Sequence, residues 1–169
     1  MKLLVRKLWF PYSIDATVNS LFRIPQMQKQ FTEGYAYDGE MRPRGIKIRS
    51  GYWPACAIME RLPSSDKDVY LVLTSMDLKG DCGRIHGRGD NKRAIASSDG
   101  YFNSWYKFRP DDVDFNAITF GEIGHALGLK HHDFDQLNPC EMSHNKIPGP
   151  RWSSLHEIRF CDECYKQIK

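Results

Sequence analysis

The segment from Phe120 to His131, FGEIGHALGLKH, constrains the fold more than any other part of this sequence. Its apolar residues recur at the spacing of an amphipathic helix, which we expect over residues 115–129. Gly128 favours the end of that helix, because a left-handed C-terminal residue is least costly without a side chain. The chain can then turn sharply and bring His131 back beside His125.

The spacing of these residues has a chemical consequence. Residues four apart lie on one face of a helix, so a ligand at position 121 and His125 would hold the same metal ion. Glu122 would lean over the open position of that metal and take a proton from bound water. Position 121 is glycine, however, which has no side chain to bind a metal. The alternative is a buried amphipathic helix followed by two surface histidines.

Cysteines gather towards the end of the chain. Cys140 begins a Cys-Glu-Met element, and Cys161-Asp-Glu-Cys164 follows near the C-terminus. The total of five cysteines is odd, which favours metal binding over a disulfide framework. A redox pair or a disulfide between Cys161 and Cys164 is the alternative. A redox Cys-x-x-Cys belongs beside a βαβ pattern, which this end of the sequence lacks.

Together these motifs resemble those of the archaemetzincins, a family of metzincin zinc metallopeptidases. The metzincin signature is H-E-x-x-H-x-x-G-x-x-H, and in archaemetzincins a Cys, a Cys-x-Met element and a Cys-x-x-Cys follow it. The resemblance is close over the C-terminal third of the chain and general elsewhere. It implies that Glu122 is the general base and that His125 and His131 bind a catalytic zinc. Gly121 stands in place of the first zinc ligand.

The same resemblance implies a second, structural zinc, with Cys140, Cys161 and Cys164 as three of its ligands. The Cys that directly follows the third His in the family is His132 in this sequence. Because Cys₃His is an ordinary structural zinc set, His132 is the candidate for the fourth ligand. Met142 would be the residue of the Met-turn, an apolar floor beneath the catalytic metal.

The resemblance also implies an α+β fold of the metzincin-like zincin type, in a single domain over residues 1–169. A twisted mixed sheet with backing helices and the active-site helix would form an N-terminal subdomain, residues 1–129. A small C-terminal subdomain, residues 130–169, would carry the Met-turn and the structural zinc site. The substrate cleft would run between the two.

Periodicity in the sequence predicts the individual elements. We expect a helix over residues 14–30 and strands at residues 2–10, 45–49, 69–74 and 93–97. Residues 69–74 are nearly continuous in apolar side chains, which indicates a central strand. We expect residues 93–97 to be the edge strand that pairs with an extended substrate. The glycine-rich stretch 79–90 is expected to be a connecting loop.

Composition narrows the class of protein. A chain of 169 residues with 41% hydrophobic and 27% charged residues is typical of one globular domain. The net charge of +3 comes without a long basic run, so nucleic acid is an unlikely partner. Arg6 and Lys7 interrupt the apolar N-terminus, which argues against a signal peptide, and no stretch is long enough to span a membrane. A cytoplasmic location is therefore expected, and the sequence indicates no oligomeric state.

The expected function is hydrolysis of a peptide or protein substrate by a zinc-activated water. Gly121 is expected to impair the catalytic zinc site, because two histidines alone bind zinc weakly, whereas the structural site is expected to be filled. Two alternatives stay open. One is a catalytically inactive metzincin-fold protein that binds peptides, and the other is a zinc-stapled binding module whose cysteines contact a partner such as nucleic acid.

Overall fold

The computed structural model describes residues 1–42, 44–46, 52–80, 83–99, 109–133, 139–144 and 152–168. The helices in these ranges are α1 (Ile14–Leu21), α2 (Pro25–Gln30), α3 (Ala55–Met59), α4 (Val113–Ala126) and α5 (Asp162–Gln167). The strands are β1 (Leu3–Leu8), β2 (Tyr35–Glu40), β3 (Trp53–Pro54), β4 (Val69–Thr74), β5 (Leu78–Gly80), β6 (Gly83–Ile85), β7 (Gly87–Asp90), β8 (Arg93–Ser97), β9 (His132–Asp133) and β10 (Ser143–His144).

A five-stranded sheet in the order β2-β1-β4-β8-β7 forms the centre of the molecule. Its first four strands are parallel, and β7 runs antiparallel to β8. The central position of β4 confirms the prediction for residues 69–74. The prediction that residues 93–97 form the edge is wrong, because the glycine-rich segment Gly87–Asp90 pairs along β8 and takes the edge itself. For the same reason, residues 79–90 are not simply a connecting loop.

The predicted helix over residues 14–30 is two helices. Pro25 is the first residue of α2, and Ile24 before it has extended backbone with ψ of 118°. Proline disfavours helical backbone in the residue that precedes it, so the first helix has to end before Ile24. The predicted strand at residues 45–49 falls largely outside the described residues.

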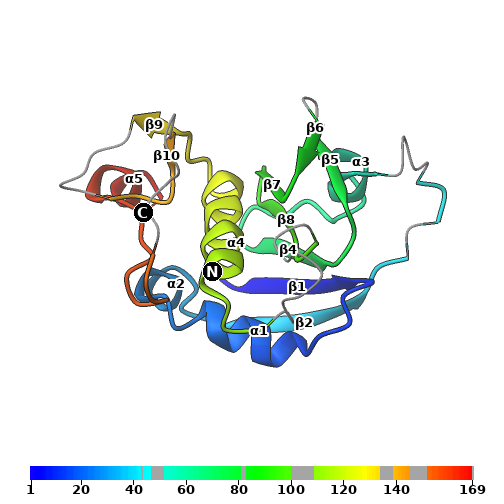
Figure 1. Ribbon diagram of the computed structural model, residues 1–169, viewed down its shortest axis with the longest axis horizontal. Coiled ribbons are helices and arrows are strands. Elements are labelled where there is room, and N and C mark those ends of the chain that lie inside the picture. Colours follow the sequence, from blue (N-terminus) through cyan, green and yellow to red (C-terminus); the bar gives the residue numbers. More distant parts are fainter. Residues whose placement is uncertain are drawn as a thin grey trace.

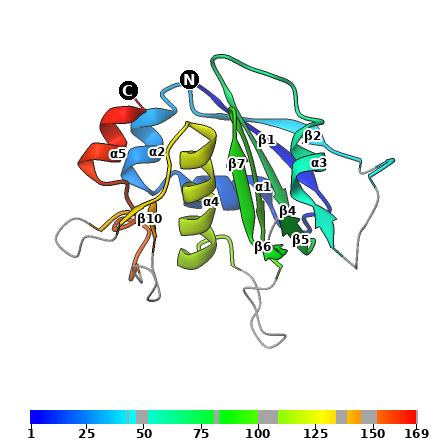
Figure 2. The same ribbon diagram turned by 90° about the horizontal axis from the view of Figure 1, so that it is seen from above.

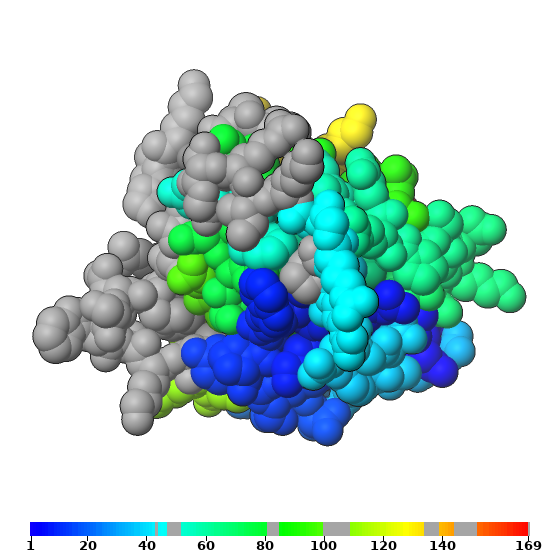
Figure 3. All heavy atoms as spheres, turned by 90° about the vertical axis from the view of Figure 1, so that its right-hand side faces the viewer, coloured from blue at the N-terminus to red at the C-terminus, as the bar shows by residue number. Residues whose placement is uncertain are grey.

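Helices cover both faces of the sheet. On one face α1, α2 and α4 enclose a core that contains Val5, Leu71 and Phe120. On the other face α3 covers a second cluster that includes Val72 and Ile95. The two clusters take alternate residues of the same strands, as the pleat of a strand requires. Figure 3 shows the α3 side, whose surface comes mainly from the blue-to-green N-terminal half of the chain.

Helix α4 stands between the sheet and the C-terminal segment that ends in α5 (Figures 1 and 2). The Phe160 ring stacks on Phe120 of α4 with centroids 4.0 Å apart. The Gln26 side chain in α2 accepts a hydrogen bond from the Phe160 backbone N–H at 2.7 Å and donates to the Phe160 carbonyl at 3.1 Å. The C-terminal segment therefore extends the main core instead of lying apart from it.

Gly124 permits this close packing. A Cβ atom at position 124 would lie 2.7 Å from Phe160 Cζ and 2.9 Å from Met142 Sδ. Side chains do not approach a Cβ so closely, so the bare helix backbone at Gly124 is what the C-terminal segment packs against. None of the helices among the described residues is long and apolar enough to cross a membrane.

Candidate metal centres

The end of α4 reverses the chain in a Schellman motif. Gly128 has a φ of +94°, its N–H donates to the His125 carbonyl at 2.9 Å, and the Leu129 N–H donates to the Gly124 carbonyl at 3.0 Å. A residue with a side chain is strained at that φ, so glycine suits this position. The reversal brings the His131 ring to 4.6 Å from the His125 ring, between centroids.

His125 and His131 face one another through their Nε2 atoms, 3.1 Å apart. Each Nδ1 lies against a backbone carbonyl, Leu129 O at 3.0 Å for His125 and Met142 O at 3.1 Å for His131. A carbonyl only accepts, so Nδ1 is the donor in each of these hydrogen bonds, and in the neutral form of each ring the Nε2 lone pair is directed at the other ring. Two nitrogens placed in this way can hold a cation between them, and metal-binding histidines have the same Nδ1–H to carbonyl support.

Glu122 lines a hollow of about 330 Å³ next to the two histidines. The pKa of its carboxyl is raised to about 8, mainly by burial and to a lesser degree by Glu141, while Arg88 opposes the shift. A carboxyl whose pKa lies near neutral pH is suited to taking up and releasing a proton. The residues that line this hollow are Ile85, His86, Gly87, Ile118, Gly121, Glu122, His125, His131, Glu141 and Met142.

Gly121 opens into the same hollow, and the space beside it is taken by Glu141. A Cβ atom at position 121 would lie 3.3 Å from Glu141 Cγ and 3.6 Å from its Oε1. The other carboxylate oxygen, Oε2, accepts a hydrogen bond from Trp152 Nε1 at 2.6 Å. Burial raises the pKa of Glu141 to about 7, against the opposing effect of the Trp152 hydrogen bond.

The edge strand β7 lies directly against α4. A Cβ atom at Gly89 would stand 1.8 Å from the Glu122 carbonyl oxygen, and one at Gly87 would stand 2.5 Å from Glu122 Cγ. These glycines let the strand backbone touch the helix that carries His125. Because β7 is the sheet edge and Gly87 lines the hollow, its backbone runs beside the histidine pair.

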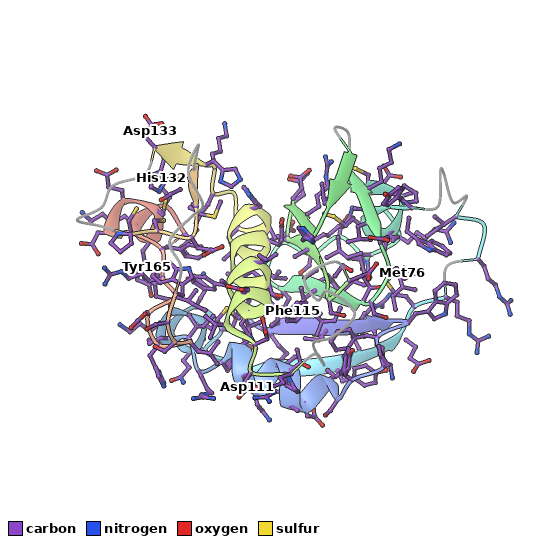
Figure 4. All side chains as sticks on the ribbon, in the orientation of Figure 1. Met76, Asp111, Phe115, His132, Asp133 and Tyr165 are labelled. Carbon is purple, nitrogen blue, oxygen red and sulfur yellow. The ribbon has the colours of Figure 1, made fainter. Side chains whose placement is uncertain are left out.

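A second group of side chains that could bind a metal ion lies near α5. The ligand atoms of four residues all lie within 4.8 Å of one another, and the residues are those predicted for the structural zinc: His132, Cys140, Cys161 and Cys164. All three cysteines are buried, and His132 Nε2 lies 3.6 Å from Cys161 Sγ. Figure 4 places His132 beside α5. The cysteines that the structure describes are free thiols, so the disulfide alternative for Cys161 and Cys164 has no support.

Backbone pairing assembles this Cys₃His cluster. Strand β9 pairs in parallel with β10, and the His132 N–H donates to the Met142 carbonyl at 3.1 Å. The Glu141 N–H donates to the Arg159 carbonyl at 2.9 Å, which holds the Cys-Glu-Met element beside the start of α5. Burial raises the pKa of the Cys140 thiol, so without a metal it keeps its proton at neutral pH. A metal must displace that proton, and its affinity falls as the pH falls.

Neither a protein-family model nor a curated protein sequence matches the chain. Solved structures do match it over almost the whole length. Archaemetzincin (AmzA) from Archaeoglobus fulgidus, complexed with malonate, is 21% identical over 99% of both chains, with a TM-score of 0.68. Archaemetzincin from Methanopyrus kandleri is 19% identical over 99% of this chain and 93% of its own, with a TM-score of 0.69. A zinc-dependent peptidase from Methanocorpusculum labreanum is 18% identical over 98% of this chain and 100% of its own, with a TM-score of 0.61.

The chain has the archaemetzincin fold. The resemblance predicted from the motifs is thereby confirmed, and so is the mixed sheet with backing helices.

Within the archaemetzincin fold the two groups of candidate ligands include residues that are direct neighbours in the sequence. His131 and His132 are adjacent, and so are Cys140 and Glu141. The Met142 carbonyl accepts from both the His131 ring and the His132 backbone, at 3.1 Å each. Met142 itself is fully buried against α4. The position of the Cys₃His cluster therefore sets the position of residues that line the hollow.

Sequence reasoning did not single out Glu141 or Trp152. Trp152 is eleven residues from Glu141 along the chain and comes beside it only in the folded protein. Glu141 had one signal that could have revealed it. It is an acidic residue inside a Cys-x-Met element, next to positions that have to be buried. The side chain of His144, another residue close to Met142 in the sequence, lies outside the described part of the chain.

Proposed function

We propose that the protein is a zinc-dependent metallopeptidase that hydrolyses peptide bonds, with the zinc held by His125 and His131. The observation that supports this best is the convergence of the two Nε2 atoms, 3.1 Å apart, each ring being fixed through Nδ1 to a carbonyl. Imidazole nitrogens are ligands that zinc accepts readily. The archaemetzincin fold, shared with a zinc-dependent peptidase, supports the same reaction class.

The residues around the hollow fit this chemistry. A bound zinc lowers the pKa of its water and polarises the scissile carbonyl. Glu122 would then accept the proton of the attacking water and pass it to the leaving amine, a role that its place in the hollow beside the two histidines allows. Met142 forms an apolar floor beside the histidines, in the place of a Met-turn residue.

The substrate we propose is a peptide or a protein segment in extended conformation. Strand β7 is the edge of the sheet among the described residues and runs beside the hollow, so we expect such a segment to pair along it. Glycines at 87 and 89 let this strand lie directly against α4, next to Glu122. A cytoplasmic location remains our proposal on the sequence argument.

The structural zinc belongs to the same proposal. His132, Cys140, Cys161 and Cys164 hold it, and it fixes residues 139–144 against α5. In this view Gly121 weakens the catalytic centre without affecting the structural one. A second candidate function, peptide binding without cleavage, is favoured by one observation only, the absence of a side chain at Gly121.

Replacement of the base tests the proposed function. Glu122→Gln should keep the zinc content and reduce cleavage of a fluorogenic peptide library by about 10²- to 10⁴-fold, the usual contribution of a positioned base. Glu60→Gln, a change at an exposed glutamate after α3, is the matched control and should cleave as the parent does. A parent protein that holds zinc at His125 and His131 and cleaves no peptide would favour the peptide-binding function.

A further inference from the structure

We infer that Glu141 is the third protein ligand of the zinc at His125 and His131, and that it replaces the ligand missing at Gly121. This inference rests on the proposed zinc centre and names a residue that completes it. The catalytic set would then be two histidines and one glutamate, which is itself a known set for hydrolytic zinc. One coordination position would remain open for water.

The first support is the fit between Gly121 and Glu141. The glutamate Cγ lies 3.3 Å from where a Cβ would be at 121, closer than side chains normally approach a Cβ. Its Oε1 lies 3.6 Å from the same point. A carboxylate on the Cys-Glu-Met element thus occupies the space in which an imidazole attached at 121 would begin. The absence of a side chain at Gly121 is what admits Glu141 to the hollow.

The second support is the set of groups that Glu141 meets. Glu141, His125 and His131 line the same hollow together with Glu122. Glu141 lies close enough to Glu122 for the two carboxylates to repel each other. Two carboxyl groups and two imidazole nitrogens in one hollow provide both negative charge and ligand atoms for a divalent cation. Arg88 is the cation that acts on Glu122 there, and it carries a single charge.

Hydrogen bonding fixes the backbone of Glu141, whereas its side chain can rotate about its own bonds. Its N–H donates to the Arg159 carbonyl, and its neighbour Cys140 belongs to the Cys₃His cluster. Trp152 binds Oε2, which leaves Oε1 on the side of Gly121. Among the described side chains, only the Cys₃His cluster brings three or more ligand atoms within 4.8 Å of one another. Zinc binding therefore requires the Glu141 carboxylate to turn towards the histidines about its own side-chain bonds.

The roles of the two glutamates differ because of their positions. Glu122 is on α4 with its Cγ against Gly87 of β7, next to the edge where a substrate would pair. Glu141 comes from the C-terminal segment, which packs on the other side of α4. Position 121 faces Glu141 on that side. Glu122 therefore stays available as the base, and Glu141 is the one that takes the place of the missing ligand.

The test counts zinc per chain by native mass spectrometry and measures the affinity of each zinc by competition with a chromophoric chelator. The parent protein should bind two zinc ions per chain. Glu141→Gln keeps the size of the side chain and an oxygen for the Trp152 hydrogen bond, but it removes the charged ligand. It should keep the structural zinc and weaken the second by more than the 10- to 100-fold that losing an outer partner of a ligand causes.

A ligand transfer gives the sharper result. The double variant Gly121→His/Glu141→Ala removes the carboxylate, makes room beside α4 and supplies an imidazole one turn before His125. It should restore the second zinc that Glu141→Gln loses. Glu60→Gln should bind two zinc ions as the parent does. The retained structural zinc reports in every variant that the C-terminal segment is folded.

The possible outcomes separate this inference from the proposed function. If Glu141→Gln binds the second zinc as tightly as the parent, Glu141 is not a ligand and the inference is wrong, while a zinc centre at the histidines stands. If the parent holds only the structural zinc and the double variant gains a second, the inference is also wrong. If neither protein binds a second zinc, the zinc centre at His125 and His131 fails as well.

Discussion

The two candidate metal centres of this molecule are built in opposite ways. The Cys₃His cluster has all its ligand atoms within 4.8 Å of one another, and its three cysteines are buried. The centre at the end of α4 has two histidines whose Nε2 atoms lie 3.1 Å apart. His131 is exposed, and Gly121 has no side chain that could bind a metal. The Cys₃His cluster has its four candidate ligands already together. The proposed catalytic centre would need a third ligand from outside the helix.

This difference implies that the proposed catalytic centre depends on the Cys₃His cluster, whereas the cluster does not depend on the catalytic centre. The cluster ligands His132 and Cys140 are the direct neighbours of His131 and Glu141. The cluster therefore fixes the backbone on which part of the catalytic centre is built. Loss of the cluster should disturb both centres, whereas loss of the catalytic centre should leave the cluster intact.

The largest effect should follow from breaking the cluster. Structural zinc contributes about 10–16 kcal/mol of apparent binding free energy, which is coupled to folding. Cys161→Ser should therefore reduce zinc to less than one ion per chain and increase hydrogen exchange over residues 139–144 and 152–168. A variant that keeps an ordered C-terminal segment and a zinc at the histidines would show that the two centres are independent.

Breaking the catalytic centre should be a local event. His131→Ala removes an exposed ring and its hydrogen bond to the Met142 carbonyl. The variant should lose the second zinc and all zinc-dependent peptidase activity, and keep one zinc with unchanged exchange around Cys161. Zinc counting and hydrogen exchange on the same sample test this. Loss of the cluster zinc in this variant would contradict the one-way dependence.

The same contrast explains what could be predicted from the sequence. The pairing of His125 with His131 follows from local spacing, because a helix and its turn place both residues. The gathering of His132 with Cys140, Cys161 and Cys164 was implied only by the resemblance to the archaemetzincins, since these residues lie far apart in the sequence. Glu141 could not be assigned to the catalytic centre, because its approach to Gly121 depends on how the C-terminal segment packs on α4. That packing depends on Gly124, whose importance appears only in three dimensions.

The strands of the sheet also differ in how well they could be predicted from the sequence. Residues 69–74 and 93–97 were predicted as strands because their apolar runs mark buried positions. Strand β7 (Gly87–Asp90) was not predicted, because a glycine-rich sequence is typical of a loop. These glycines are needed because α4 packs directly on the strand, which the sequence does not reveal. Glycine at 89 is required there by a helix carbonyl 1.8 Å from where its Cβ would be.

Two glycines of α4 should respond differently to alanine. Gly124→Ala places a Cβ against Phe160 and Met142 at under 3 Å, so it should destabilise the protein by about 1–3 kcal/mol through overpacking. Gly121→Ala meets only the flexible Glu141 side chain, and alanine favours a helix by about 1 kcal/mol over glycine. It should be close to neutral. Urea unfolding of both variants checks this, and equal losses would count against the packing described for the C-terminal segment.

The smallest effect concerns pH. The pKa of Glu122 is raised from 4.5 to about 8 in the folded protein, so the folded state binds its proton more tightly than the unfolded state does. The resulting stability is present below about pH 4.5 and is lost as the pH rises to about 8. With the second site free of zinc, Glu122→Gln should remove this slope, which is below about 1.4 kcal/mol per pH unit for a partly exposed group. Unfolding curves of both proteins between pH 5 and 8.5 that change in parallel would contradict the assignment.

The most direct measurement is a crystal structure of the zinc-loaded protein with data collected at the zinc absorption edge. We expect two anomalous peaks per chain. One should be bound by His132, Cys140, Cys161 and Cys164 with sulfur at about 2.3 Å, and the other by His125, His131 and Glu141. A single peak at the cysteines, or a second peak that Glu141 does not bind, would contradict this expectation.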